Sequence, residues 1–385
     1  MPTKISSSPL KKVRLGVVGL GGMGAAHCAS LLNGIVPNCE LVAVSDTNPK
    51  LLELYPAQTC FLNAYECIQS KLIDAILITT PHYSHTPLGI AALQAGLHVM
   101  MEKPLSVHKA DCEKLLSAHK NPRQVFSGMF NQRTDPRYQK IRSLVTSGKI
   151  GKIRRINWII TDWYRTEAYY SSGRWRATWE GEGGGILVNQ AIHNLDLFQW
   201  IFGMPDNVRG FCQLGRYHEI EVEDDVTAYF DYADGTTAVF ITSTGESPGT
   251  NRLEVTGDLG KIVLENNQLQ LTLNTVSMTQ FGKKSKNGSD RPKSKFQSIP
   301  LPNNAGEQHI GILKNFTRAI LKGETLLAPA AEGINSVILG NAILMSSLQG
   351  KTITLPFASS TYTALLKKLI LNSKVKKIPK PKTNL

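Results

Sequence analysis

The sequence feature that most constrains the fold is a glycine-rich segment near the N-terminus. Residues 19–24 read Gly-Leu-Gly-Gly-Met-Gly, and they join an apolar, strand-like segment at 13–19 to a stretch of helical apolar spacing that ends at Asn33. A second strand-like segment, residues 40–46, ends in Asp46. A strand, a G-x-G-x-x-G turn, a helix and a strand that ends in an acid together form the pattern of a dinucleotide-binding βαβ unit.

The glycines of this turn have different physical tasks. Gly19 allows the tight turn, Gly21 lets the main chain approach the pyrophosphate, and Gly24 lets the helix pack closely on the strand. The helix presents free N–H groups and the positive end of its dipole to the phosphates. The candidate cofactor-binding residues in this unit are Gly19, Gly21, Gly22, Met23, Gly24 and Asp46.

The acid at the end of the second strand indicates which dinucleotide binds. The Asp46 carboxylate can accept hydrogen bonds from the adenosine ribose hydroxyls, and it would repel a 2′-phosphate. NADP sites usually place an arginine here, whereas Thr47 and Asn48 follow in this chain. We therefore predict NAD, with NADP as the alternative that Lys50 could support.

Strands and helices continue to alternate after this unit. We expect further strands at residues 73–79, 97–101 and 125–130, with helices at 88–95 and 110–119 between them. Such alternation predicts a parallel, doubly wound sheet, in which ligands bind at the carboxyl ends of the strands. The residues that follow these strand ends are further candidates for the cofactor site: Thr80, Pro81, His82, Glu102, Lys103 and Asn131.

The remainder of the chain has a different pattern. Residues 153–163 alternate like a strand, and residues 226–243 read as a β-hairpin around Asp234-Gly235. Strands that follow one another without helices between them predict a largely antiparallel sheet. Helical spacing recurs at residues 185–202, 308–322 and 331–348.

We therefore predict an α/β Rossmann domain followed by an α+β domain with a largely antiparallel, open sheet. The first domain would bind NAD, and the second would carry the substrate site and the contacts between subunits. The predicted boundaries are an N-terminal tail at residues 1–11, the NAD-binding domain at 12–130, the second domain at 131–358 and a basic C-terminal tail at 359–385.

Two segments supply almost all of the net charge of +13. Residues 283–295 hold six basic residues and one acid, and residues 359–385 hold seven lysines and no acid. The first segment has the Gly, Ser, Asn and Pro of a loop, and the second ends in a Lys/Pro tail, so we expect both to be solvated. No zinc-finger, homeodomain or RNA-recognition signature accompanies them, and no specific nucleic-acid partner is predicted.

The cysteines indicate a cytoplasmic protein with reduced thiols. The six cysteines include no C-x-x-C pair and suggest neither a disulfide framework nor a zinc site, so no metal is expected. Basic residues precede the apolar residues 15–18, but this run is too short for the apolar core of a signal peptide. No apolar stretch of 18 residues exists, so no membrane segment is predicted.

Taken together, these motifs resemble the Gfo/Idh/MocA oxidoreductases, the family of glucose–fructose oxidoreductase and inositol dehydrogenase. The resemblance covers about residues 12–355. The residues that carry it are 19–24 with His27, Asp46, Thr80-Pro81 with His85, Glu102-Lys103-Pro104, Asn131-Gln132-Arg133 with Asp135-Pro136, and 183–187 with His193 and Asp196-Leu197. It adds His85 to the candidate cofactor-binding residues.

The resemblance implies hydride exchange between a nicotinamide and a hydroxyl-bearing carbon of a sugar, glycoside or cyclitol. It places Lys103 beside the nicotinamide and His193 beside the reacting hydroxyl. One helical turn before His193 the family has an aspartate, and this chain has Asn189, which can hydrogen-bond but cannot titrate. We expect a subfamily variation here, as at His82, where relatives often have asparagine.

The residue types suit this chemistry. Oxidation of an alcohol needs a base for the hydroxyl proton and a cation for the developing alkoxide. Histidine, with an unperturbed pKa near 6.5, suits the first task, and a lysine suits the second. The candidate catalytic residues are Lys103, His193 and Asn189.

An aromatic and arginine cluster precedes the glycine triplet at 183–185. Aromatic rings stack on sugar C–H faces, and arginines bind hydroxyls or carboxylates. The alternative is that these side chains pack a long loop or a subunit contact. The candidate substrate-binding residues are Lys103, Arg133, Trp163, Tyr164, Arg165, Trp175, Arg176, Asn189 and His193.

The predicted function is an NAD-dependent oxidoreductase that acts on a carbohydrate or polyol. One alternative is a glycosidase-like enzyme with tightly bound NAD that oxidises the sugar transiently and eliminates. Another is a non-catalytic dinucleotide-binding regulator, although the presence of both Lys103 and His193 argues against it. The family resemblance also implies a homodimer or homotetramer formed through the C-terminal sheet.

Overall fold

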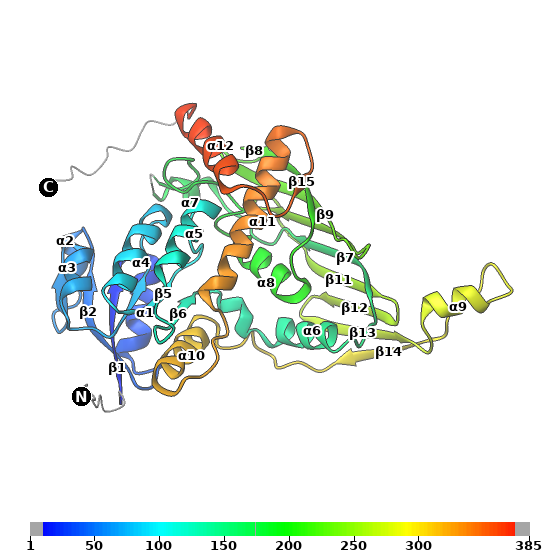
Figure 1. Ribbon diagram of the computed structural model, residues 1–385, viewed down its shortest axis with the longest axis horizontal. Coiled ribbons are helices and arrows are strands. Elements are labelled where there is room, and N and C mark those ends of the chain that lie inside the picture. Colours follow the sequence, from blue (N-terminus) through cyan, green and yellow to red (C-terminus); the bar gives the residue numbers. More distant parts are fainter. Residues whose placement is uncertain (1–10, 174, 374–385) are drawn as a thin grey trace, which may run out of the picture. The chain divides into compact units, whose positions relative to one another are not determined.

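The computed structural model describes residues 11–173 and 175–373, and it divides the chain into two compact units (Figure 1). Within the described residues, unit 1 comprises 11–106, Asp111–Asn131 and Glu307–Gly333. Unit 2 comprises Val107–Ala110, Gln132–Gly306 and residues 334–373. No helix within these described residues is long and apolar enough to cross a membrane.

Unit 1 is built on a six-stranded parallel sheet with the order β3-β2-β1-β4-β5-β6. The inner strands are buried apolar runs, as expected where helices cover both faces of a sheet. The predicted parallel, doubly wound sheet is thus confirmed. The strands are β1 Val13–Val18, β2 Cys39–Ser45, β3 Thr59–Phe61, β4 Ala75–Ile78, β5 His98–Met101 and β6 Phe126–Gly128.

Helices connect the strands of this sheet. They are α1 Gly22–Leu32, α2 Pro49–Leu52, α3 Ala64–Gln69, the 3-10 turn η1 His82–Ser84, α4 His85–Gln94 and α5 Lys109–Ala118. Helix α10, Gln308–Lys322, joins the unit from a distant part of the chain. The chain begins each of α2 and α3 with an asparagine whose side chain accepts a main-chain N–H, a common N-cap.

Residues 307–333 are assigned differently from the sequence prediction, which placed them in the second domain. They belong to unit 1 and return to the edge strand β6. The Ser127 hydroxyl and the Gly128 N–H both donate to the Ala328 carbonyl, at 2.8 and 2.9 Å. Sequence patterns cannot show this return, because the partners lie about 200 residues apart.

Unit 2 contains a nine-stranded sheet with the order β14-β13-β12-β11-β7-β10-β9-β8-β15. Its neighbours are antiparallel except for β7 and β10, which are parallel, so the predicted largely antiparallel sheet is confirmed. The strands are β7 Ile153–Ile160, β8 Asn207–Leu214, β9 Glu223–Asp231, β10 Thr237–Ser243, β11 Asn251–Gly257, β12 Gly260–Glu265, β13 Gln268–Asn274, β14 Ser294–Ile299 and β15 Ile353–Thr354.

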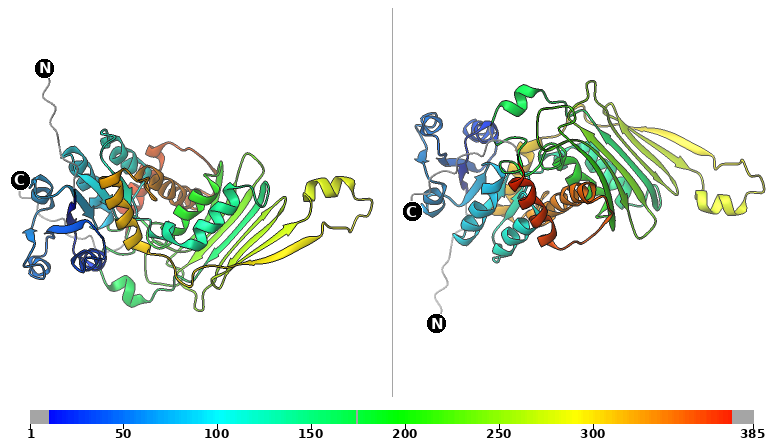
Figure 2. Two further views of the ribbon diagram at one scale, coloured as in Figure 1. Left: turned by 90° about the horizontal axis from the view of Figure 1, so that it is seen from below. Right: turned by 90° about the horizontal axis from the view of Figure 1, so that it is seen from above.

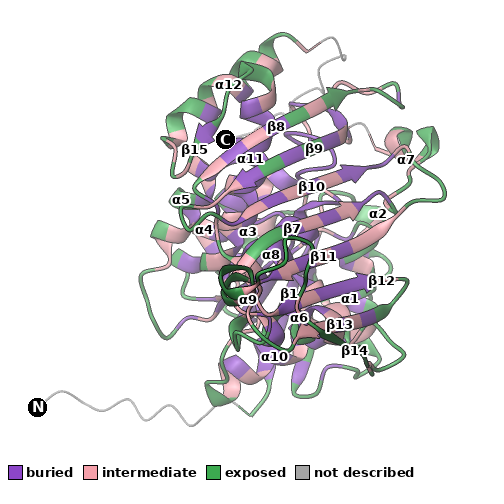
Figure 3. Ribbon diagram, turned by 90° about the vertical axis from the view of Figure 1, so that its right-hand side faces the viewer, coloured by how far each residue is buried: buried purple, intermediate pink, exposed green. Residues whose placement is uncertain are grey.

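Helices cover one face of this sheet (Figure 2). Ile156, Trp158 and Ile160 alternate along β7 with less buried residues, so the inner face of the strand forms core. Figure 3 looks onto the opposite face, where intermediate and exposed residues alternate with buried ones. The helices of this unit are α6 Pro136–Thr146, α7 Glu167–Ser171, α8 Ile192–Phe202, α9 Met278–Lys284, α11 Ala330–Gln349, which begins in unit 1, and α12 Ser359–Leu371.

The two basic segments contain more structure than the sequence predicted. Helix α12 occupies residues 359–371, and its Tyr362 and Leu366 are buried, so this part is not a tail. In the 283–295 segment, α9 ends at Lys284 and β14 begins at Ser294, which leaves a shorter loop. Of the tails predicted at residues 1–11 and 359–385, residues 1–10 and 374–385 lie outside the described residues.

Candidate active site

The glycine-rich turn of unit 1 has the geometry that a dinucleotide requires. Gly19 follows β1 with φ of +93°, a left-handed conformation that favours glycine. A Cβ on Gly24 would overlap the carbonyl oxygen of Gly19, so only glycine allows α1 to pack this closely. A Cβ on Gly21 or Gly22 would meet no atom within 4 Å, which leaves open space beside the start of α1.

Asp46 fixes the same turn from the end of β2. Its Oδ2 accepts a hydrogen bond from the Leu20 N–H at 2.7 Å, and its Oδ1 accepts one from the Asn48 N–H at 2.8 Å. The side chain is partly exposed, and each carboxylate oxygen retains a lone pair for a ribose hydroxyl. The contact of Asp46 with the adenosine ribose stays a prediction.

Two further observations fit a dinucleotide at this edge of the sheet. Gly21 caps α1 without any side-chain hydrogen bond, so main-chain N–H groups of the first turn remain available for a phosphate. The hydroxyl of Thr80, which follows β4, is buried and has no hydrogen-bond partner among the residues that the structure describes. The residues present therefore fit NAD, and residues 19–24 would hold its pyrophosphate and Asp46 its ribose.

The His85 ring contacts main-chain carbonyl groups of two loops at this site. Its Nδ1 lies 2.8 Å from the Pro104 carbonyl oxygen, and its Nε2 lies 2.8 Å from the Thr80 carbonyl oxygen. The ring is buried, and this desolvation lowers its pKa. The His85 ring therefore lies between the loops after β4 and β5. Its predicted contact with the cofactor stays a prediction. The neighbouring His82 is also buried.

Lys103 follows β5 and is anchored by a buried acid. Glu102 Oε2 accepts a hydrogen bond from the Lys103 N–H at 3.1 Å, and Glu102 Oε1 lies 2.8 Å from His27 Nε2. Burial alone would raise the pKa of Glu102, but the His27 hydrogen bond and the nearby cations keep it below its usual value. The Lys103 side chain is half-buried.

A second histidine from a distant segment joins this group. The His309 ring, on α10, lies 5.6 Å from the His27 ring in an edge-to-face arrangement. The charge of Glu102 raises the pKa of His309, but burial outweighs it and lowers the pKa overall. The sequence offered no signal for His309. Asn131 is tied to the same helix, because its Nδ2 donates to Gln308 Oε1 at 2.7 Å.

In unit 2, His193 is buried at the start of α8. The Trp163 ring lies nearly parallel to the His193 ring, at 23° and 6.4 Å between centroids. The indole N–H of Trp163 donates to Asn194 Oδ1 at 3.0 Å, which fixes the indole beside the helix. The structure therefore brings together two of the residues that the sequence predicts for the substrate site.

Helix α8 begins later than the sequence predicts, because residues 183–191 form turns. Gly183 has φ of +85°, and a Cβ on Gly185 would overlap the carbonyl oxygen of Glu223. Glu223 Oε1 accepts hydrogen bonds from the N–H groups of Gly185 and Leu187, at 2.9 and 3.1 Å. Burial raises the pKa of Glu223 to about 7.

The aromatic and arginine cluster converges on Tyr169. The Arg165 guanidinium lies 5.0 Å from the Tyr169 ring centroid, and the Arg176 guanidinium lies 4.6 Å from it. Arg176 also lies 4.5 Å from the Trp175 ring. The Tyr169 hydroxyl lies within 3.1 Å of the side-chain nitrogens of Arg176, Asn189 and Gln190. Tyr164 is half-exposed at 49 %.

Arg133 does not join this cluster. Its side chain is fully buried, and it forms a two-pronged ion pair with Asp196 at 2.7 and 2.6 Å. A guanidinium enclosed in this way cannot reach a substrate, which corrects the predicted substrate-binding role. Trp158, which lies near the cluster in sequence, is likewise in the core, where it packs on Tyr138 and Phe240.

Comparisons with known proteins agree with this geometry. Residues 13–129 match the oxidoreductase family with an NAD-binding Rossmann fold, and residues 138–263 match the GFO/IDH/MocA C-terminal domain. The chain is 24% identical over 355 residues to a myo-inositol 2-dehydrogenase of Thermotoga maritima, a match that covers 89% of this chain and 98% of that protein.

Two solved structures share the fold. The WlbA dehydrogenase of Chromobacterium violaceum, in complex with NADH and UDP-GlcNAcA, is similar with a TM-score of 0.79 at 22% identity, over 92% of this chain and 99% of that one. A levoglucosan dehydrogenase in complex with NADH and levoglucosan has a TM-score of 0.74 at 20% identity, over 90% and 100% of the two chains. Both domain matches point to one family, and this chain belongs to the GFO/IDH/MocA family of NAD-binding oxidoreductases.

Proposed function

We propose that the protein transfers hydride between NAD and a secondary alcohol of a sugar, glycoside or cyclitol. The observation that carries the proposal is that one chain contains two polar residues, Lys103 and His193, in surroundings that suit this reaction. Lys103 is anchored at the carboxyl end of an NAD-binding sheet, and His193 is buried at the start of α8 beside Trp163. The names of relatives support the substrate class, since they include a myo-inositol 2-dehydrogenase and a levoglucosan dehydrogenase.

The proposed roles follow from the chemistry of each side chain. In the oxidation direction, His193 takes the hydroxyl proton, and the Lys103 ammonium stabilises the negative charge that develops on the oxygen. NAD, when bound, accepts the hydride from the carbon. The alcohol thus loses a proton and a hydride and becomes a carbonyl. Arg165, Arg176 and the aromatic rings around Tyr169 are proposed to bind the remainder of the substrate.

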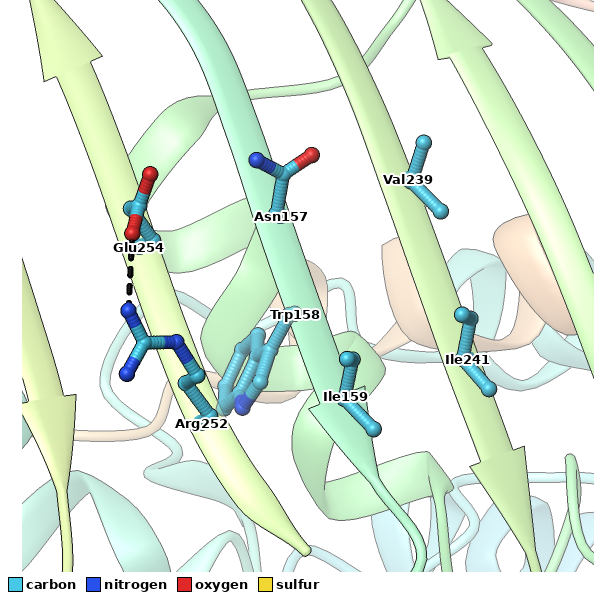
Figure 4. Close-up of a pocket in the computed structure, with 7 residues that line it drawn as sticks. All are labelled: Asn157, Trp158, Ile159, Val239, Ile241, Arg252 and Glu254. Atoms are coloured by element: carbon cyan, nitrogen blue, oxygen red, sulfur yellow. Dashed lines mark hydrogen bonds and ion pairs between the residues drawn. The ribbon is translucent and has the colours of Figure 1, made fainter.

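The proposed assembly is a homodimer or homotetramer that forms through the open face of the nine-stranded sheet. Figure 4 shows a shallow pocket on this sheet, lined by apolar side chains beside a charged pair. Ile159, Val239 and Ile241 supply the apolar surface, and Arg252 Nη2 donates to Glu254 Oε2 at 2.9 Å. A second copy of this sheet would cover these side chains. Exposed Phe211 and Tyr229 on β8 and β9 add apolar surface.

The experiment is a panel of sugars, glycosides and cyclitols with NAD and with NADP, followed by absorbance of the reduced cofactor. We expect turnover with NAD that Lys103→Ala and His193→Ala each reduce at least 100-fold, and His193→Ala should change NAD affinity little. Turnover that survives both substitutions would contradict the proposal. Substrate consumption without net NADH would favour the glycosidase-like alternative, and NAD binding without any turnover would favour the regulator.

A further inference from the structure

Asp224 is a buried acid of unit 2 that the proposed chemistry does not use. It is the second residue of β9, and it is fully buried. Its side chain accepts hydrogen bonds from three successive main-chain N–H groups of the loop between β8 and β9, those of Arg216, Tyr217 and His218, at 2.9, 2.9 and 3.2 Å. Both of its oxygens therefore act as acceptors, as those of a carboxylate do.

The ring of His218 lies between two oxygen atoms. Its Nδ1 is 2.9 Å from Asp224 Oδ2, and its Nε2 is 2.9 Å from the main-chain carbonyl oxygen of Arg165. A carbonyl oxygen can only accept, and Oδ2 already accepts two main-chain N–H groups. A neutral imidazole has one N–H and an imidazolium has two, so only the imidazolium can donate to both oxygens.

The surroundings of the ring favour these two bonds over contact with water. His218 is 9 % exposed, and the Tyr170 ring lies 4.7 Å from it between centroids. The one cation within reach on the same loop, Arg216, is paired with Asp225 at 2.8 Å. Among the residues that the structure describes, His218 is therefore the residue whose positive charge would balance Asp224.

The main chain of Arg165 is held from both sides. Its carbonyl oxygen faces His218, and its N–H donates to the Thr244 carbonyl at 2.9 Å. The Thr244 N–H donates in turn to the main-chain carbonyl of Asp224 at 3.0 Å. A closed cycle of contacts thus connects Asp224, His218, Arg165 and Thr244. Asp224 reaches one side of Arg165 through its side chain and the other side through its main chain.

This cycle fixes the segment that carries the aromatic and arginine cluster. The Arg165 guanidinium donates from Nη1 to the Tyr164 carbonyl at 2.8 Å and lies 5.0 Å from the Tyr169 ring centroid. Helix α7 begins directly after Arg165, and the Thr166 side chain caps it by accepting the Tyr169 N–H. A displaced Arg165 carbonyl would therefore shift both the guanidinium and the start of α7.

We propose that His218 is an imidazolium that positions Arg165 and the start of α7 for substrate binding. His218 is a positioning residue, because it acts through the main chain of Arg165. Asp224 supplies the opposite charge and fixes the loop that carries the ring. The inference rests on the proposed function only where substrate binding is concerned, since the charge of the ring and its contact with Arg165 are measurable without a substrate.

The first experiment counts the hydrogens on the His218 ring by NMR of the full-length wild type with 15N-labelled histidine. The signals are assigned through the contact of this ring with Tyr170. We expect hydrogen on both nitrogens at about pH 7.5, where an exposed histidine, with a pKa near 6.5, is mostly neutral. A ring with one hydrogen at this pH would overturn the proposal. The measurement needs no variant, so it decides the charge even where a substitution prevents folding.

The second experiment measures amide hydrogen exchange of residues 163–170 in the wild type and in His218→Gln. A glutamine amide can donate to one of the two oxygens but not to both, so exchange in this segment should become about tenfold faster. His119→Gln is the matched control, because the His119 ring also contacts a carbonyl oxygen, that of Gln124, but lies in unit 1. Equal exchange in His218→Gln and the control would contradict the contact with Arg165.

The third experiment is a double-mutant cycle on the best substrate from the panel, with His218→Gln, Arg165→Met and the double variant. We expect His218→Gln to raise KM about tenfold and to leave kcat within about threefold, whereas His119→Gln should change neither. If His218 acts through Arg165, the double variant should have nearly the KM of Arg165→Met alone. Fully additive losses would overturn the positioning role, as would an unchanged KM in His218→Gln.

The outcomes separate the two proposals. Turnover by a protein in which His218→Gln leaves KM unchanged would reject the role of His218 and retain the proposed function. If no substrate turns over, the proposed function fails, and the NMR and exchange data still decide whether a charged His218 holds Arg165.

Discussion

Glu102 and His27 form a buried pair, with 2.8 Å between Glu102 Oε1 and His27 Nε2, and the second oxygen of the same carboxylate accepts the N–H of Lys103. The pair therefore links α1, which begins in the glycine-rich turn, to the loop that carries the proposed catalytic lysine. The Glu102 carboxylate thus fixes the position of α1 relative to the loop that carries Lys103.

We predict that His27→Ala destabilises the protein by about 3 kcal/mol, because it leaves a buried carboxylate without its partner. His27→Gln, which retains a donor, should lose less. Denaturation in urea measures both free energies of unfolding. Equal losses for the two variants would show that the ring fills space and that its hydrogen bond is unimportant.

The same pair predicts a pH dependence. The pKa of Glu102 is lowered in the folded protein, so its stabilising contribution is present above the unfolded pKa and is lost as the pH falls through the folded pKa. Unfolding free energies of wild type and Glu102→Gln should therefore converge as the pH falls below about 4.5, the usual value for glutamate. A constant difference between pH 7 and pH 3 would contradict this assignment.

Asp46 offers a test of cofactor choice. Asp46→Ala removes two hydrogen bonds to the main chain of the glycine-rich turn and the proposed acceptor for the ribose. We expect the NAD dissociation constant to rise at least tenfold and the NADP constant to rise less, which calorimetry with both dinucleotides would measure. Glu53→Gln, an exposed acid at the end of α2, serves as the control and should change neither constant.

Arg133 and Asp196 should matter for folding and not for substrate affinity. Arg133→Met leaves Asp196 buried without its partner and should cost about 3–5 kcal/mol of stability. Adding Asp196→Leu should recover much of this loss, because an apolar pair can replace a buried ion pair. The KM of protein that remains folded should stay within about twofold of wild type, and a tenfold increase would restore the predicted role in substrate binding.

Glu223 predicts the opposite pH dependence to Glu102. Its pKa is raised to about 7, above the value of 4.5 for an exposed glutamate, so its ionisation costs stability as the pH rises between these values. The loss between pH 5 and pH 8 would reach at most about 3 kcal/mol. Glu223→Gln retains the acceptor for Gly185 and Leu187 and should reduce this loss. A variant that is as pH-dependent as the wild type would assign the effect to another group.

The sequence predicted the features that depend on local patterns. The glycine-rich turn, Asp46 and the alternation of strands and helices were sufficient to predict the Rossmann domain. The role of Arg133 was misassigned, because only its tertiary partner shows that it faces Asp196. The place of the His85 ring between two carbonyl oxygens likewise depends on tertiary partners that the sequence does not show. His309 was missed for the same reason.

Turns and short helices were the other source of error. The sequence predicts a helix from residue 185, but the N–H groups of Gly185 and Leu187 donate to Glu223, nearly 40 residues away, and residues 185–187 form turns. The sequence predicts a solvated tail where helix α12 forms, because the lysines of this segment outweigh its few apolar residues, among them the buried Tyr362 and Leu366. In both cases the deciding partners lie far away in sequence.

The return of residues 307–333 to unit 1 has a consequence for how the protein is made. During synthesis the ribosome releases β6 long before α10 and the segment that bonds to β6. Eight of the nine strands of the second sheet, all but β15, emerge from the ribosome in that interval. Strand β6 of the NAD-binding unit therefore lacks its bonding partner until most of unit 2 has been synthesised. A fragment that ends at residue 130 would never acquire this partner, and its β6 edge would stay exposed.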